Sequence, residues 1–209
     1  MKIFLIIVTT IVIISALVVG YIYNKFTYKP DYFQTAEQVE IWKVAEQAKE
    51  IEKRVTEDLE SEGYAKLSGD DIMKLEIIQL EAETNIEINS IVKKTKSEII
   101  DGKLKSEAVI NIKALSLQNV SGQARQYINT FMQYVPDTMM EEVYVSFEGT
   151  PVNENGTIRF SKDMVISVGD IIHTTFESQD NDIEIDLDLL HKINASQIVI
   201  RDNYIEIIK

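Results

Sequence analysis

The hydrophobic pattern of the first 29 residues differs from that of the rest of the chain. Residues 3–23 contain no charged side chain. At about 1.5 Å per residue they form a helix of roughly 32 Å, long enough to cross a hydrocarbon core of about 30 Å. A cleaved secretory signal has a shorter apolar region, about 7–15 residues, and ends in small residues. This run ends in Val-Gly-Tyr-Ile-Tyr, so the sequence predicts an uncleaved transmembrane anchor, with residues 1–29 as anchor and flank.

Aromatic and basic residues flank the end of this run. Tyr21, Tyr23 and Tyr28 lie where an interfacial aromatic belt forms, and Lys25 and Lys29 can extend into the headgroups. Lysine also precedes the run at position 2, so the positive charges on its two sides nearly balance. The residues alone therefore leave open which side of the membrane carries the C-terminal part.

Helical periodicity follows in two segments. Between residues 35 and 61 hydrophobic residues recur every three or four positions, which predicts an amphipathic helix. They are Val39, Trp42, Ala45, Ala48, Ile51, Val55 and Leu59. Gly63 is expected to end this helix. The Ser-x-x-Asp pattern at 68–71 predicts the start of a second helix, which Ile72, Leu75, Ile78 and Ala82 continue.

The period then changes to two, which is typical of strands. Residues 86–100 and 104–114 are predicted to be two strands joined by a type I′ turn at Asp101-Gly102. A short helix is expected over residues 123–134, ending before Pro136. Further strands are predicted at residues 143–149, 157–160, 164–168, 171–176, 183–189, 198–200 and 204–208. Residues 151–156 are expected to be a connection between two of these strands. Strands 157–160 and 164–168 are expected to pair, and Asp202-Asn203 is expected to be the turn of a second hairpin.

Together these elements predict an α+β fold. It consists of an N-terminal transmembrane helix, amphipathic helices, and a curved antiparallel sheet with one buried face. We divide the chain into the anchor and its flank (1–29), an amphipathic stalk helix (30–66) and an α+β domain (67–209).

Net charge excludes several classes of function. The chain has 21 Lys and Arg, 34 Asp and Glu, no cysteine and a net charge of −13. Residues 1–29 carry three lysines and no acid, which leaves −16 on residues 30–209. Such acidity argues against a nucleic-acid partner, whose phosphates need Lys and Arg. The absence of cysteine excludes disulfides, thiolate zinc sites and cysteine nucleophiles.

Candidate chemistry is sparse in the sequence. His173 and His191 lie in hydrophobic surroundings and are expected to be non-catalytic. Five alternating acids are the best candidate for a metal site, but without a bending glycine we expect them to form the solvated face of a strand. They are Asp180, Asp182, Glu184, Asp186 and Asp188. Glycosylation acceptor patterns occur at Asn119, Asn155 and Asn194, and chance explains them. Met139-Met140 is expected to fill a core or to line an adaptable hydrophobic contact.

Several short segments of the C-terminal half resemble a known group of proteins. They are Val145-Ser-Phe-Glu-Gly-Thr-Pro151, Asn155-Gly-Thr-Ile158, Val165-Ile-Ser-Val-Gly169 and Arg201-Asp-Asn-Tyr-Ile-Glu206, with Leu67-Ser-Gly-Asp-Asp-Ile72 and the Asp101-Gly102 hairpin in the same layout. Together they are similar to bacterial single-pass membrane-anchored proteins of the YpmS or LmeA sort, which are related to tubular lipid-binding domains. The resemblance implies a helix lying in a curved sheet around an apolar groove, on the extracytoplasmic side. It transfers no functional residues.

Two functions follow as hypotheses. The first is a membrane-anchored, non-enzymatic protein that binds lipid or a lipid-linked envelope component in an apolar groove. The second is a structural or assembly subunit of a membrane complex that pairs with a protein partner through its stalk helix. We expect no catalytic, metal-binding or cofactor-binding residues, since no nucleophile–base pair or acid–base set can be assembled. Because an acidic domain is repelled by anionic lipid, any lipid contact is expected to be apolar.

Overall fold

The computed structural model describes most of the chain from residue 20 onward. The described residues are 20–84, 87–118, 132, 136–154, 157–160, 164–170, 172–176, 184–185, 188–193 and 197–209. The helices are α2 (Tyr32–Thr35), α3 (Ile41–Ser61), α4 (Gly69–Thr84), α5 (Ile88–Ile91), α6 (Ile112–Leu117), the 3-10 helix η1 (Asp137–Met139) and α8 (Asp188–Lys192). The strands are β1 (Tyr64–Leu67), β2 (Val92–Ile100), β3 (Lys103–Ile110), β4 (Val143–Gly149), β5 (Pro151–Glu154), β6 (Thr157–Phe160), β7 (Met164–Val168), β8 (Ile172–Phe176), β9 (Glu184–Ile185), β10 (Gln197–Ile200) and β11 (Ile205–Ile208).

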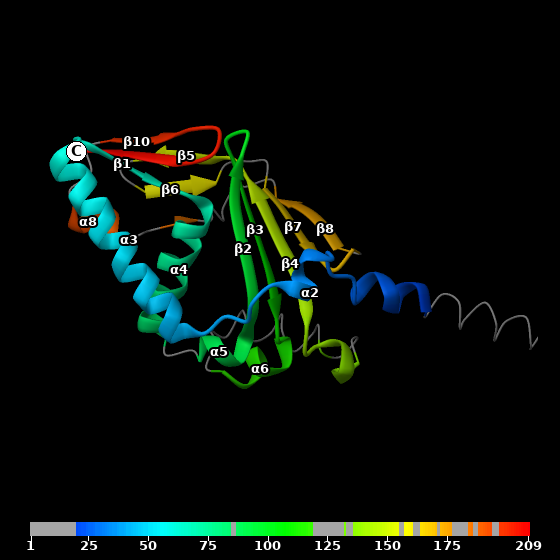
Figure 1. Ribbon diagram of the computed structural model, residues 1–209. Coiled ribbons are helices and arrows are strands. Elements are labelled where there is room, and N and C mark those ends of the chain that lie inside the picture. The colour runs from blue at the N-terminus through cyan, green and yellow to red at the C-terminus, as the bar shows by residue number, and fades with distance from the viewer. Residues whose placement is uncertain are drawn as a thin grey trace, which may run out of the picture.

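Helices and antiparallel sheets together make an α+β fold, as predicted. Within the described residues the strands form not one sheet but three, with the orders β1-β11-β10, β2-β3-β4-β7-β8 and β5-β6-β9. Figure 1 shows the five-stranded sheet with the long β2–β3 hairpin at one edge, with α3 and α4 on one side and α2 on the other. The two smaller sheets lie close to the C-terminus.

Both predicted hairpins are confirmed. Asp101 and Gly102 have φ values of 52° and 72°, as a type I′ turn between β2 and β3 requires. Strands β10 and β11 pair on either side of Asp202-Asn203. The Gly102 N–H donates to the carbonyl of Asp202 at 3.1 Å, so the tips of the two hairpins are hydrogen-bonded to each other.

The start of α4 follows its sequence signal. The Asp71 N–H donates to Ser68 Oγ at 3.1 Å, and the Ser68 N–H donates to Asp71 Oδ2 at 2.8 Å. This reciprocal pair is a capping box with Asp in the acidic position. Gly63, with φ of 79°, follows α3 and confirms the predicted stop. One residue later the chain enters β1, which sets α3 and α4 side by side.

The predicted start of the first long helix is wrong. It begins at Ile41 rather than residue 35, because the Val39 N–H donates to the carbonyl of Lys93, at 2.8 Å, instead of entering a helix. Trp42, predicted on the buried face, is 58% exposed, and Val44 is buried in its place. Val39 lies before the helix and Ala45 is half-buried. The stripe is correct from Ala48 onward, since Ala48, Ile51, Val55 and Leu59 are all buried.

The apolar face of α3 is buried inside the chain's own largest core. That core joins α3 and α4 to residues of all three sheets, including Leu67 of β1, Leu104 of β3, Phe160 of β6 and Ile207 of β11. Helix α8 closes it with Leu189 and Leu190. The face that the second functional hypothesis assigns to a partner helix is therefore in contact with the chain itself.

Other boundaries also differ from the alternating pattern. Strand β2 begins only at Val92, because residues 88–91 form α5. Strand β3 ends at Ile110, because the Asn111 side chain accepts the Ala114 N–H at 2.8 Å and starts α6.

Residues 151–154, predicted to be a connection, are β5 and pair with β6. The predicted pairing of 157–160 with 164–168 is wrong, since β7 pairs with β4 and β8. Among the described residues of the predicted strand 183–189, residues 184–185 form β9, whereas Asp188 begins α8.

Two predicted segments lie mainly outside the described residues. The first is the helix at 123–134, of which only Met132 is described. The second is the uncharged run, of which residues 20–23 are described and are helical. In the part of the chain that the structure describes, no helix has the length and hydrophobicity needed to cross a membrane.

Candidate functional site

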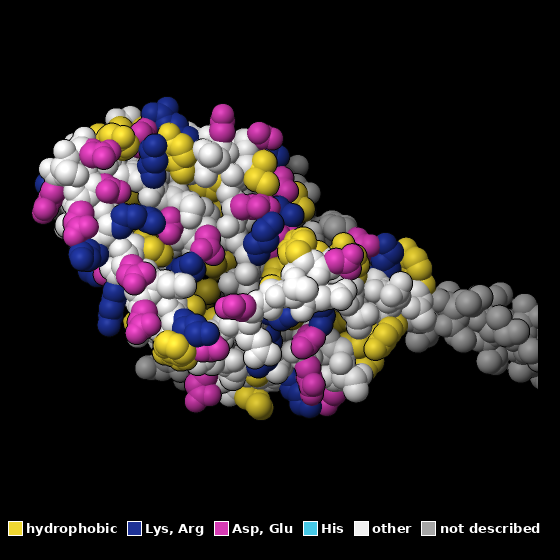
Figure 2. Space-filling view, viewed as in Figure 1, with side chains coloured by type: hydrophobic (Ala, Val, Ile, Leu, Met, Phe, Trp, Pro, Cys, Tyr) yellow, Lys and Arg dark blue, Asp and Glu magenta, His cyan; other side chains and the backbone are white. Residues whose placement is uncertain are grey.

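An apolar groove lies between α4 and one face of the five-stranded sheet. Its volume is about 220 Å³. Its wall is made by Met73 of α4, by Ser106, Glu107 and Ala108 of β3, by Val145, Ser146 and Phe147 of β4, and by Ile166 of β7. Figure 2 shows recessed hydrophobic side chains in the gap between α4 and β2, within a surface where acids and lysines are interspersed.

The hollow arises from the order of side chains across the sheet. Register places Ser106 opposite Phe147, which faces Ile166, and places Ala108 opposite Val145. Since side chains on paired strands share a face, the two small residues of β3 leave space beside larger ones. The only hydroxyl among these five residues, on Ser106, is 2.8 Å from Ser97 Oγ in a hydrogen bond. The Ser106 hydroxyl is thus satisfied internally, and the other four side chains of this set are hydrocarbon.

One end of the groove is closed by aromatic packing. The rings of Phe147 and Phe160 are perpendicular, with centroids 4.8 Å apart, and Phe160 is fully buried. A Cβ on Gly149 would lie 2.9 Å from Phe160 Cδ1, so the strand approaches the ring as closely as a glycine allows. This end is therefore continuous with the main core.

The other end leads toward the N-terminal segment. Val145 and Val168, which are paired across β4 and β7, pack against a second buried cluster. That cluster consists of Phe26, Ile112, Met140 and Val143. The groove thus runs from the main core toward Phe26, three residues beyond the predicted membrane run. Met140, fully buried here, fills a core as expected.

A buried carboxylate lies on the opposite face of the same sheet. Glu107 of β3 is 2% exposed, and its Oε1 accepts hydrogen bonds from the hydroxyls of Tyr32, at 2.5 Å, and of Tyr144. Lys105 Nζ is 3.1 Å from the same oxygen. Within the described part of the chain, Oε2 has no hydrogen-bond partner. The cluster ties α2 to the sheet.

The hydrogen bonds of this cluster decide its protonation. Burial alone raises the pKa of the Glu107 carboxyl, but the hydrogen bonds from Tyr144, Tyr32 and Lys105 outweigh burial and hold that pKa below its usual range. Burial, followed by the bond to Glu107, raises the pKa of both tyrosines far above the usual value. Glu107 is therefore ionised at neutral pH and the two hydroxyls remain proton donors. The cluster is a structural link between α2 and the sheet.

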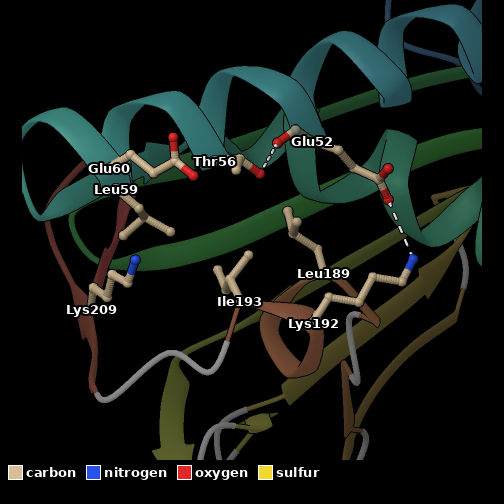
Figure 3. A pocket seen from close by; sticks show the side chains of 8 residues that line it. All are labelled: Glu52, Thr56, Leu59, Glu60, Leu189, Lys192, Ile193 and Lys209. Atoms are coloured by element: carbon tan, nitrogen blue, oxygen red, sulfur yellow. Dashed lines mark hydrogen bonds and ion pairs between the residues drawn. The ribbon is translucent and has the colours of Figure 1, made fainter.

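A larger crevice lies between α3 and α8. It measures about 440 Å³ and is lined by Glu52, Thr56, Leu59, Glu60, Leu189, Lys192, Ile193 and Lys209, as Figure 3 shows. Glu52 and Lys192 face each other across it with an N–O distance of 3.8 Å. Two acids and two lysines balance, so the crevice favours neither an anion nor a cation.

The sequence candidates are not assembled into a site. Strand β8 contains His173 and α8 contains His191, but the side chains of both lie outside what the structure describes, as do the side chains of the five alternating acids. The acceptor asparagines at 119, 155 and 194 also lie outside it. Among the described residues, no group of three or more His, Asp or Glu side chains is placed to hold a metal ion.

Sequence reasoning missed both the groove residues and the Glu107 cluster. Met73 follows Ile72 on α4 and carries no special signal, and Ala108 looks like any other alternating position. Glu107 belongs to the polar phase of β3, which an alternating pattern assigns to solvent.

Comparison with known proteins gives no relative for this chain. No protein-family model, no curated protein and no solved structure matches it.

Proposed function

We propose that this protein is a membrane-anchored, non-enzymatic protein that binds an acyl chain of a lipid, or of a lipid-linked envelope component, in the groove under α4. The observation that carries the proposal is the apolar groove between helix and sheet. The predicted anchor supports attachment to a membrane, and the resemblance to bacterial single-pass envelope proteins supports an extracytoplasmic position for the domain.

The size of the groove limits what enters it. An engineered protein cavity of about 150 Å³ holds benzene, and pockets for drug-sized ligands begin at about 300 Å³. At about 220 Å³ the groove accommodates part of one acyl chain and leaves the headgroup outside. Because each buried CH₂ contributes about 0.8 kcal/mol, affinity is expected to rise with chain length until the groove is full.

Charge supports an apolar ligand over an ionic one. The one charged residue in the groove wall is Glu107, but its carboxylate lies on the opposite face of the sheet, where it is bonded to Tyr32 and Tyr144. A negatively charged headgroup finds no counter-ion among the remaining wall residues. The apolar face of α3 is already buried in the chain, which favours lipid binding over helix pairing with a partner.

Two neighbouring residues of β7 provide the test, because they alternate between the faces of the sheet. Ile166 lines the groove, whereas Val165 is not part of its wall, and both are half-buried. Placing a lysine at Ile166 puts a charge in the groove, which is unfavourable for an acyl chain. We expect Ile166→Lys to retain less than a tenth of the lipid that co-purifies with the detergent-extracted wild-type chain, measured by mass spectrometry.

Val165→Lys is the matched control and is expected to retain wild-type lipid content. Thermal unfolding of both variants checks that they are folded. Equal lipid loss in the two variants, or a wild-type chain without lipid, contradicts the proposal.

A further inference from the structure

The chain contacts the domain as soon as it leaves the uncharged run. The carbonyl of Lys25 accepts the N–H of Asp170, in the β7–β8 turn, at 2.8 Å. The Lys25 ammonium also forms an ion pair with the Asp170 carboxylate. The main chain and the side chain of Lys25, the second residue after the uncharged run, are therefore both bonded to the β7–β8 turn of the five-stranded sheet.

Gly169 makes this contact close. It has φ of 58°, and a Cβ at this position would lie 2.7 Å from the carbonyl oxygen of Phe26 and 2.8 Å from that of Lys25. Its N–H donates to the carbonyl of Tyr144 at 2.8 Å, which fixes the turn to β4. No side chain fits between the turn and the N-terminal segment.

The next residues hold the end of the sheet from both faces. We call residues 25–36 the strap. Phe26 is buried with Val143 on the groove side, and Phe33 is buried with Val109 and Tyr144 on the other side. Successive residues of a strand point to opposite faces, so the strap crosses the end of the sheet between these two positions. Lys94 Nζ donates to the carbonyl of Phe33, and Tyr32 bonds Glu107, which fixes the far part of the strap.

The surface of this end suits a lipid headgroup region. Tyr21, Ile22, Tyr23 and Tyr28 are 65%, 49%, 51% and 46% exposed. Tyrosines with one apolar and one polar end are typical of the membrane interface. Lys25 and Lys29 pair with Asp170 and Glu142, which neutralises two acids that anionic lipid would repel.

We propose that the end of the five-stranded sheet at the β7–β8 turn is a membrane-contacting surface, locked to the anchor by the strap and facing phospholipid headgroups. The inference rests on the anchor of the proposed function. Ile166, in the groove, precedes Gly169 by three residues, roughly 10 Å along a strand. The lock therefore holds the groove close to the bilayer from which an acyl chain would come.

The absence of cysteine allows single labels to test the contact. The full chain is placed in vesicles of phosphatidylcholine and phosphatidylglycerol, with a fluorophore on Asp170→Cys or on Glu62→Cys. Asp170 is in the turn, and Glu62 follows α3 near the C-terminus, far from the N-terminal helix (Figure 1). We expect lipids that carry a quencher on the headgroup to quench the first label at least threefold more than the second. Equal quenching overturns the inference.

A pair of glycines tests the lock. Gly169 and Gly102 both have positive φ in a turn, but a Cβ at Gly102 would meet no atom within 4 Å. Spin labels on Asn24→Cys and on the 82% exposed Leu117→Cys are expected to give one narrow distance distribution in vesicles. Gly169→Ala should at least double its width, and Gly102→Ala should leave it unchanged.

The two proposals fail in different ways. A broad distribution in the unsubstituted background, or equal widths for the two glycine variants, overturns the lock while the anchor and the groove stand. If alkaline carbonate releases the chain from vesicles, the chain has no transmembrane anchor. That result contradicts the anchor of the proposed function and, with it, the proposed membrane contact.

Discussion

Replacing Phe160 by alanine is expected to lower the free energy of unfolding by about 3–5 kcal/mol, the usual cost of removing a large buried aromatic side chain. Phe160 is fully buried, and its ring meets both Phe147 and the close approach of Gly149. Since Gly149 and Phe147 are on β4 and Phe160 is on β6, the ring joins two sheets. Urea unfolding of the detergent-solubilised chain, followed by circular dichroism, measures the change.

Trp42→Ala is the control for Phe160→Ala. Trp42 is also a large aromatic residue, but it is 58% exposed, so its loss is expected to cost no more than about 0.5 kcal/mol. A cost for Phe160→Ala as small as this would show that the ring does not hold the sheets together. Phe160→Leu keeps most of the volume and should fall between the two.

Removing both tyrosine hydroxyls from the Glu107 cluster is expected to cost about 3–5 kcal/mol, because a buried carboxylate then loses its neutral donors. The double variant Tyr32→Phe/Tyr144→Phe leaves only Lys105 bonded to Glu107. Tyr32 is 41% exposed and Tyr144 is 6% exposed. Water can replace the first hydroxyl more readily than the second, so Tyr144→Phe alone should cost more than Tyr32→Phe alone.

The same cluster predicts a dependence on pH with a definite sign. The pKa of Glu107 is lower in the folded chain than in the unfolded chain. Its contribution to stability is therefore complete above the unfolded pKa, about 4.3, and is lost as pH falls through the lower folded pKa. The free energy of unfolding should decrease over this acid range, and Glu107→Gln should flatten the decrease. An unchanged slope, or equal costs for the two single tyrosine variants, contradicts this role for Glu107.

Local signals predicted the parts of the fold that local forces determine. The Asp101-Gly102 turn, the Ser68 cap and the strand conformation of β3 and β4 each depend on a few neighbouring residues, and each was confirmed. The errors arose where a distant partner competes with the local pattern. Val39 bonds the main chain of Lys93 instead of joining a helix, and Asn111 ends an alternation that continues through Ala114.

The groove depends on tertiary arrangement even more strongly. Alternation shows that Ala108 and Val145 share a face, but it does not show that Met73 lies across from them or that Ser106 bonds Ser97. An alternating pattern assigns Glu107 to solvent, because Tyr32, which covers it, is 75 residues earlier in the chain. In each case the missing information is which distant segments pack together.

Cross-linking by a lipid with a photoactivatable group near the end of one acyl chain tests the central claim most directly. The full chain in vesicles that contain this lipid is irradiated, digested and sequenced by mass spectrometry. We expect adducts on residues 73, 145 and 166 from α4, β4 and β7, and at least a tenfold loss of the adducts at 73 and 145 in Ile166→Lys but not in Val165→Lys. Adducts confined to residues 1–28, with none in the groove, would contradict lipid binding under α4.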